Sequence, residues 1–145
     1  MAQALEVALL YSTRWLIEEF HKALKTGTKA EQWPLESAEG LFAAIAIKRV
    51  VAWRLIELRE RVRIAPDASA AQSGLSKLEL EVLRTTLNRP IKTVREVALA
   101  VGRLGGPLNR KGDGMPGWQT LFRGMSKLND LVEGVRLGLK MKKFG

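Results

Sequence analysis

The sequence predicts an all-α fold of about five helices, and three observations support that prediction. Apolar residues recur three and four positions apart along most of the 145 residues, as they do in helices that bury one face. Two capping boxes and several glycine or proline stops mark where helices begin and end. No stretch shows the alternation of apolar and polar residues that is typical of a half-buried strand. We therefore expect helices throughout and no sheet.

The first predicted helix runs from about Ala2 to Thr26 and contains neither proline nor glycine. Gly27 follows it and can adopt the left-handed conformation that closes a helix. The apolar residues on one side of this helix are Leu9, Leu16, Phe20, Ala23 and Leu24. We expect this side to fold back on the other helices, since apolar side chains of this size promote aggregation when they are exposed.

The second predicted helix begins after Ser37, a plausible N-cap, and runs to about Arg63, with Pro66 as its stop. The residues expected on its buried side are Leu41, Phe42, Ile45, Val50, Val51, Leu55 and Leu58. Three tryptophans are expected to lie in the core or to be partly buried anchors: Trp15, Trp33 and Trp53.

Two short helices come next, after an alanine- and serine-rich linker at residues 67–74. Ser76 and Glu79 form the Ser-x-x-Glu capping box of the third helix, which stops before an Asn-Arg-Pro turn. Thr93 and Glu96 repeat the pattern for the fourth helix, which a Gly-Gly-Pro sequence closes.

The fifth predicted helix begins near Pro116, after a basic glycine-rich loop, and continues to about Lys140. Its apolar residues alternate spacings of three and four and form a heptad seam: Trp118, Leu121, Met125, Leu128, Val132, Val135 and Leu139. Such a seam packs well against another helix. We expect self-association through it, and the alternative is that it packs only on the second and fourth helices of the same chain.

Composition excludes several classes of site. The chain has no cysteine and one histidine, so a metal ion would have to be bound by oxygen atoms. No segment is apolar enough to span a membrane and no signal peptide is visible, so we expect a cytoplasmic protein without membrane partners. The net charge is +9, and its excess lies after residue 75, with fourteen basic and six acidic side chains. This basic half predicts attraction to nucleic acid.

One face of the first helix gathers polar groups of a particular kind. At 100° per residue, Tyr11, Arg14, Glu18 and Lys25 lie within about 60° of one another, with Lys22 close by. A carboxylate can bind a divalent metal ion while the cations beside it bind phosphate oxygens. The alternative is a solvated face on which Arg14 and Glu18 form an ordinary i, i+4 pair.

The residues of this face match a family signature. They read Y-x2-R-x3-E-x6-K, which resembles the motif of bacterial insertion-sequence transposases of the IS-four family, and in particular those of the transposon-five type. A second resemblance, to the dimerisation region that closes these transposases, lies at residues 103–106 and 110–114 and at Trp118. The two together cover nearly the whole chain.

The resemblance implies roles for individual residues. Glu18 would be the catalytic third carboxylate of a DDE triad and a metal ligand, and Mg²⁺ or Mn²⁺ would serve the intact family enzyme. Tyr11, Arg14 and Lys25 would contact DNA at the transposon end, with Lys22 a weaker candidate. Partners would be this DNA and a second subunit, with no nucleotide cofactor.

The sequence departs from the family pattern in its acidic residues. The first two acids of the triad lie on strands of a ribonuclease-H-like sheet, which would precede Met1 and is absent here. We therefore expect residues 1–33 to be the last helix of a truncated catalytic domain and residues 34–145 to be a helical dimerisation domain. We expect this chain alone to bind no catalytic metal and to cleave no DNA, which incubation with labelled DNA and Mn²⁺ would test.

Two other functions remain open from the sequence. The chain could pair with an intact transposase in mixed dimers and inhibit it, in which case excess chain would reduce transposition. It could instead be a small basic helical DNA-binding protein that uses its last seventy or so residues, although no recognition-helix motif is present.

Overall fold

Helices account for most of the chain that the computed structural model describes. The described residues are Tyr11, Arg14, Trp15, residues 17–22, Lys25, residues 38–106 and residues 114–142. Within these residues there is no strand, and Ser69 and Thr93 form an isolated β-bridge. The all-α prediction is confirmed. No helix in these ranges is both long enough and apolar enough to cross a membrane.

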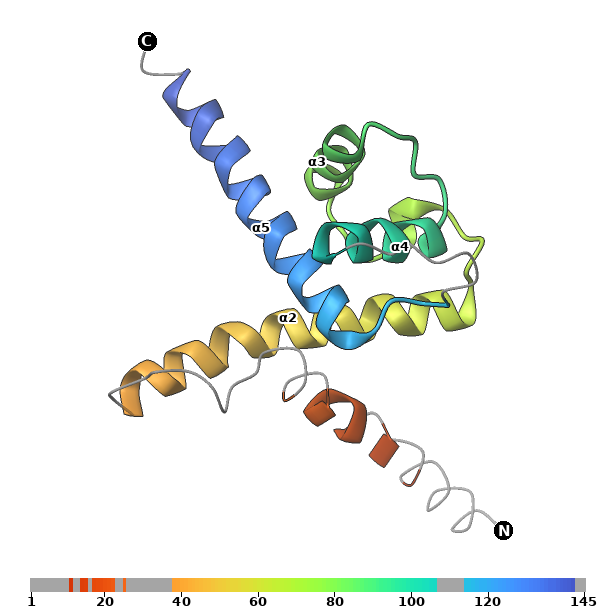
Figure 1. Ribbon diagram of the computed structural model, residues 1–145, viewed down its shortest axis with the longest axis vertical. Helices are drawn as coiled ribbons and strands as arrows, with labels where there is room; N and C mark the ends of the chain where they lie inside the picture. The colour runs from red at the N-terminus through yellow and green to blue at the C-terminus, as the bar shows by residue number, and fades with distance from the viewer. Residues whose placement is uncertain are drawn as a thin grey trace.

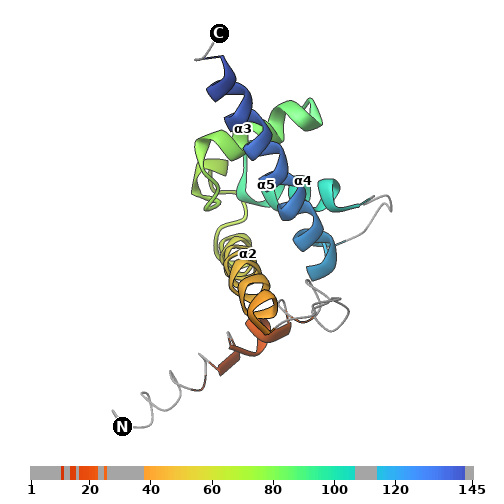
Figure 2. The same ribbon diagram turned by 90° about the vertical axis from the view of Figure 1, so that its left-hand side faces the viewer.

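The helices with defined bounds are α2 (Ala38–Ile64), the 3-10 helix η2 (Ala70–Gln72), α3 (Lys77–Leu87), α4 (Val94–Gly105) and α5 (Trp118–Met141). Described residues between 11 and 25 are also helical and are called the first helix below. Helices α3, α4 and η2 lie together, with α5 crossing α4 and the C-terminal half of α2 running alongside (Figure 1). The N-terminal half of α2 and the C-terminal half of α5 project from this cluster, and the projecting end of α5 is also plain in Figure 2.

Both predicted capping boxes are present. The amide of Glu79 donates to Ser76 Oγ over 3.3 Å, and the amide of Ser76 donates to Glu79 Oε2 over 2.7 Å. Thr93 and Glu96 exchange the equivalent pair of hydrogen bonds at 3.2 and 3.3 Å. These bonds connect residues three apart, so the sequence alone was sufficient to place the starts of α3 and α4.

Three local predictions need correction. The linker at residues 67–74 contains η2, which Ser69 caps by accepting a hydrogen bond from the amide of Ala71. Helix α5 begins at Trp118 rather than near Pro116, because Gly117 takes an extended conformation as its N-cap. Trp53 is 62% exposed and Trp15 is 47% exposed, so neither is a core residue. Ser37, Trp33 and residues 107–113 lie outside the described residues, as do Leu9, Leu16 and Leu24.

The core forms where α4 crosses α5. Gly105 and Gly124 face each other there, and a Cβ atom on either would overlap a backbone carbonyl, that of Thr120 or of Val101. The two helix backbones therefore touch, which only glycine permits. Fully buried side chains surround this crossing: Leu55, Leu58, Leu83, Ile91, Val97, Val101, Leu121, Met125 and Leu128.

The buried side of α2 was predicted correctly only in its C-terminal half. Val51, Leu55 and Leu58 are buried, whereas Phe42 and Val50 are 70% and 61% exposed. Val50 points about 100° away from Val51 and falls on the exposed side of α2 with Arg49 and Trp53. Phe42 lies on the half of α2 that projects beyond the helices able to cover it (Figure 1).

Candidate functional site

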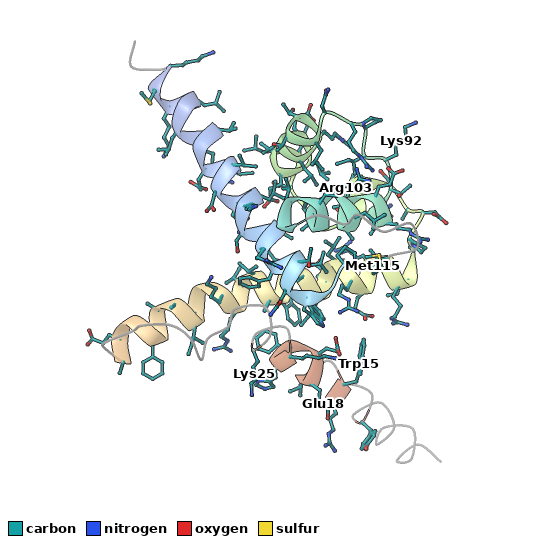
Figure 3. The ribbon with its side chains drawn as sticks, in the orientation of Figure 1. Trp15, Glu18, Lys25, Lys92, Arg103 and Met115 are labelled. Carbon is teal, nitrogen blue, oxygen red and sulfur yellow. The ribbon has the colours of Figure 1, made fainter. Side chains whose placement is uncertain are left out.

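The polar face predicted for the first helix is present on the described residues. Tyr11, Arg14, Glu18 and Lys25 are all helical and all exposed. Arg14 Nε lies 3.1 Å from Glu18 Oε1, and the Arg14 guanidinium lies 5.7 Å from the centre of the Tyr11 ring. The structure thus brings three of the predicted residues into direct contact. Figure 3 shows Glu18 and Lys25 on this helix, on the opposite side of α2 from α4.

Lys22, the weaker candidate, has a different neighbour. Its Nζ atom lies 3.7 Å from Glu19 Oε1, one position around the helix from Glu18. Both Lys22 and the Arg14–Glu18 pair are more than 60% exposed, so these ion pairs are weak in energy and open to exchange for other partners.

The carboxylates that the structure describes do not assemble a metal site. No group of three or more histidine, cysteine, aspartate or glutamate side chains is placed to hold a metal ion within the part of the chain that the structure describes. Glu18 is bound to Arg14, and Glu19 lies toward Lys22 and Arg59. A pair of catalytic metal ions needs several carboxylate ligands at once, so these residues could supply only part of such a site.

The first helix is held against the rest of the chain by Arg59 of α2. Its Nη1 atom lies 3.8 Å from Glu19 Oε2, and its guanidinium lies 4.3 Å from the centre of the Trp118 ring. Phe20 also packs against the core, as expected for the apolar side of this helix. A cavity of about 290 Å³ lies beside Arg59 and is lined in part by Trp15 and Met115 (Figure 3). No sequence pattern predicted that Arg59 would make this connection, because its partners are distant along the chain.

The heptad seam of α5 divides into two parts. Five of its residues lie in the chain's own core with at most 8% of their surface exposed: Trp118, Leu121, Met125, Leu128 and Val132. Val135 and Leu139 are 40% and 56% exposed. Only the second part of the seam is available to another molecule.

A polar contact between α2 and α3 also escaped the sequence analysis. Arg54 Nη2 lies 2.8 Å from Glu79 Oε1, and both side chains are largely buried. Burial acts to raise the pKa of Glu79, but hydrogen bonds from Ser76 and Arg54 outweigh it and hold the pKa below its usual range. Glu79 therefore caps α3 and joins it to α2 with one carboxylate.

The second half of α2 and everything after it match a known family. Residues 50–145 match the family model described as the Transposase Tn5 dimerisation domain. The match covers more than half of the chain and includes α3, α4 and α5. It begins beside Val51, a buried residue of α2, and it does not include the polar face of the first helix.

Proposed function

The chain belongs to the family of Tn5 transposase dimerisation domains, and from this premise we propose that it serves as the C-terminal part of a cut-and-paste DNA transposase. In this proposal α5 joins two subunits, and the first helix contacts the transposon end. Residues 1–33 would belong to the catalytic domain and residues 34–145 to the dimerisation domain.

The exposed end of α5 is the observation that supports the dimer contact. Leu131, Val135 and Leu139 continue one face of the helix beyond the core, where each is at least 40% exposed. Gly138 lies beside this face, about 60° around the helix from Val135, and a Cβ atom on it would have nothing within 4 Å. This face therefore offers apolar side chains and room for a close backbone approach, which suits a second copy of α5.

Sedimentation equilibrium of the full chain tests this contact. Changing Val135 and Leu139 to Asp is expected to convert a dimer into a monomer, because two charges would be buried in an apolar interface. Leu137→Asp is the matched control, since Leu137 is 59% exposed and points about 160° away from Val135. Equal loss of dimer in both variants would exclude the seam as the contact.

The polar face of the first helix supports the DNA contact. Arg14 and Lys25 would bind phosphates, and Tyr11 would lie beside them. The Glu18 carboxylate would be one ligand of a metal site completed by aspartates from the rest of the catalytic domain. Because Arg14 now pairs with Glu18, a bound phosphate and a metal ion would replace that pair.

Band-shift titration tests the DNA contact. Arg14→Ala with Lys25→Ala is expected to weaken binding to the cognate transposon-end duplex more than binding to an unrelated duplex. Lys77→Ala is a control, since Lys77 is an exposed cation at the start of α3. A double variant that binds both duplexes as the unchanged chain does would remove the first helix from the proposal.

The same α5 face would also permit pairing with an intact transposase. If mixed dimers form, the unchanged chain will reduce transposition when it is in excess, and the chain with Val135→Asp and Leu139→Asp will not. Inhibition that persists in the double variant would require another explanation.

A further inference from the structure

The turn between α3 and α4, residues 88–93, is fixed by hydrogen bonds to two other parts of the chain. Arg84 of α3 donates from Nη2 to the carbonyl of Ile91 over 2.9 Å. The carbonyl of Lys92 accepts from the amide of Ala70 in η2 over 2.7 Å. Ile91 is 1% exposed and anchors the turn in the core. Side chains carried by this turn therefore start from a fixed backbone.

Cationic side chains lie along this turn and continue along α4. They are Arg89, Lys92, Arg95 and Arg103, and together they are called the α4 basic surface. Lys92, Arg95 and Arg103 are exposed, and Figure 3 shows Lys92 and Arg103 on the side of α4 away from α2. None of the ion pairs found among the described residues includes any of the four.

Four of the five arginines of α2 show the opposite behaviour, and the fifth, Arg49, is exposed and belongs to none of these ion pairs. Arg54, Arg59, Arg61 and Arg63 each lie within 4 Å of a glutamate carboxylate, at distances from 2.6 to 3.8 Å. Arg54 and Arg59 thereby join α2 to α3 and to the first helix, whereas Arg61 and Arg63 pair with glutamates of α2 itself. Since the α4 cations have no such partner, their charge is available to a ligand.

Two carboxylates lie near the α4 basic surface and do not cancel it. Glu96 Oε2 accepts hydrogen bonds from the amides of Lys92 and Thr93 at 2.6 and 3.3 Å. These bonds, together with the charges of Arg89 and Lys92, hold the pKa of Glu96 below its usual range, so this carboxylate offsets part of the positive charge. Asp67 is exposed next to Pro66, whose carbonyl accepts from the amide of Arg95. Four cations against two carboxylates leave a positive surface.

The dimensions of this surface suit a nucleic-acid backbone. Arg95 and Arg103 are eight positions apart on α4, which corresponds to about 12 Å along the helix. One strand of duplex DNA carries a phosphate about every 3.4 Å of axial rise, so this span faces several phosphates. Guanidinium groups bind phosphate oxygens in pairs, and three of the four cations are arginines.

The other side of α4 argues against a membrane surface as the partner. A helix that lies on a membrane needs a free apolar face to insert. On α4 that face is used by the core, because Val94, Val97, Ala98 and Val101 are at most 1% exposed. The exposed face has charge without apolar side chains that could insert.

We propose that the α4 basic surface binds the phosphate backbone of duplex DNA without reading its sequence. This site is separate from the first helix and does not depend on the contacts proposed for it. Phosphate contacts position a protein on DNA without specifying sequence, so this surface would hold DNA that flanks any specifically bound segment.

Fluorescence anisotropy with the full chain and two unrelated 30-base-pair duplexes tests this proposal. Lys92, Arg95 and Arg103 are changed together to Gln, and the binding constant is measured over a range of KCl concentrations. The slope of log K against log[KCl] is negative, and each lost phosphate contact reduces its magnitude by about 0.9. The triple variant is therefore expected to show a slope smaller in magnitude by about 2.7 on both duplexes. Thermal melting followed by circular dichroism verifies that the variant is folded.

The matched control removes the same charge from α5, with Arg123, Lys127 and Lys140 changed to Gln. The proposal requires a clearly smaller loss of slope in this control. Equal losses would mean that net charge alone attracts DNA, and an unchanged slope in the α4 variant would remove the site. Binding of the unchanged chain to phosphatidylserine vesicles that the α4 variant loses, with DNA binding retained, would overturn the proposal in favour of a membrane.

Discussion

Helix α5 has two halves with the same apolar spacing and different surroundings. From Trp118 to Val132 its seam residues are at most 8% exposed, whereas Val135 and Leu139 are 40% and 56% exposed. The first half crosses α4, and the second half projects beyond the other helices (Figure 1). A regular seam thus predicts that a helix will bury one face, but it does not say which molecule supplies the cover.

The glycines of α5 repeat this difference. Gly124 faces Gly105 at the crossing, and a Cβ atom there would overlap the backbone of α4. Gly134 and Gly138 meet nothing within 4 Å. The first pair has already been used to bring two helices of one chain together. Gly138, which lies beside Val135, is still open to another molecule, and this supports the dimer contact that we propose for the second half.

Truncation of seam residues should show the largest difference between the halves. Leu128→Ala is expected to lower the free energy of unfolding by about 2 to 5 kcal/mol, because Leu128 is fully buried and its loss leaves a cavity. Val135→Ala should change it by less than about 0.5 kcal/mol. Urea denaturation, at a protein concentration too low for dimers to form, measures the change in the free energy of unfolding for both variants. Similar losses would mean that the two halves are equally covered within one chain.

Adding a methyl group to the glycines should show the next largest difference. Gly124→Ala is expected to cost about 3 kcal/mol, because the new Cβ atom forces α4 and α5 apart at Val101. Gly138→Ala should instead stabilise the monomer by up to about 1 kcal/mol, since alanine is the better helix former. The same denaturation measurement applies. Destabilisation of the monomer by Gly138→Ala would show that the second half of α5 is covered after all.

Ion pairs should show the smallest difference. Glu79→Gln removes a largely buried partner of Arg54 and is expected to cost about 2 kcal/mol at neutral pH. Glu133→Gln removes an exposed i, i+3 partner of Arg136 in the second half of α5 and should cost less than about 0.5 kcal/mol.

The pH dependence of stability gives the Glu79 prediction a direction. The folded pKa of Glu79 is lowered, so its contribution is complete above its unfolded pKa of about 4.3 and is lost as the pH falls through the folded pKa. The stability gap between the unchanged chain and Glu79→Gln should therefore narrow below about pH 4. A gap that stays constant down to pH 2 would show that Glu79 does not act through its charge.

Local spacing along the first helix predicted one set of contacts in the candidate site. Tyr11, Arg14 and Glu18 come into contact because they lie three and four positions apart on one helix. Arg59 lies forty residues from Glu19, and no periodicity connects them. The first helix packs against α2 through residues that are distant from it in the sequence. The turn that carries part of the α4 basic surface is likewise held by hydrogen bonds to α3 and η2.

The sequence by itself determined the all-α class and the starts of α3 and α4, because capping hydrogen bonds join residues three apart. Only the tertiary structure decided that Leu128 is core while Leu139 and Phe42 are surface. The physical reason is that burial depends on cover supplied by segments far away in the chain. A helix's own sequence specifies which face is apolar, and the rest of the fold determines how much of that face is covered.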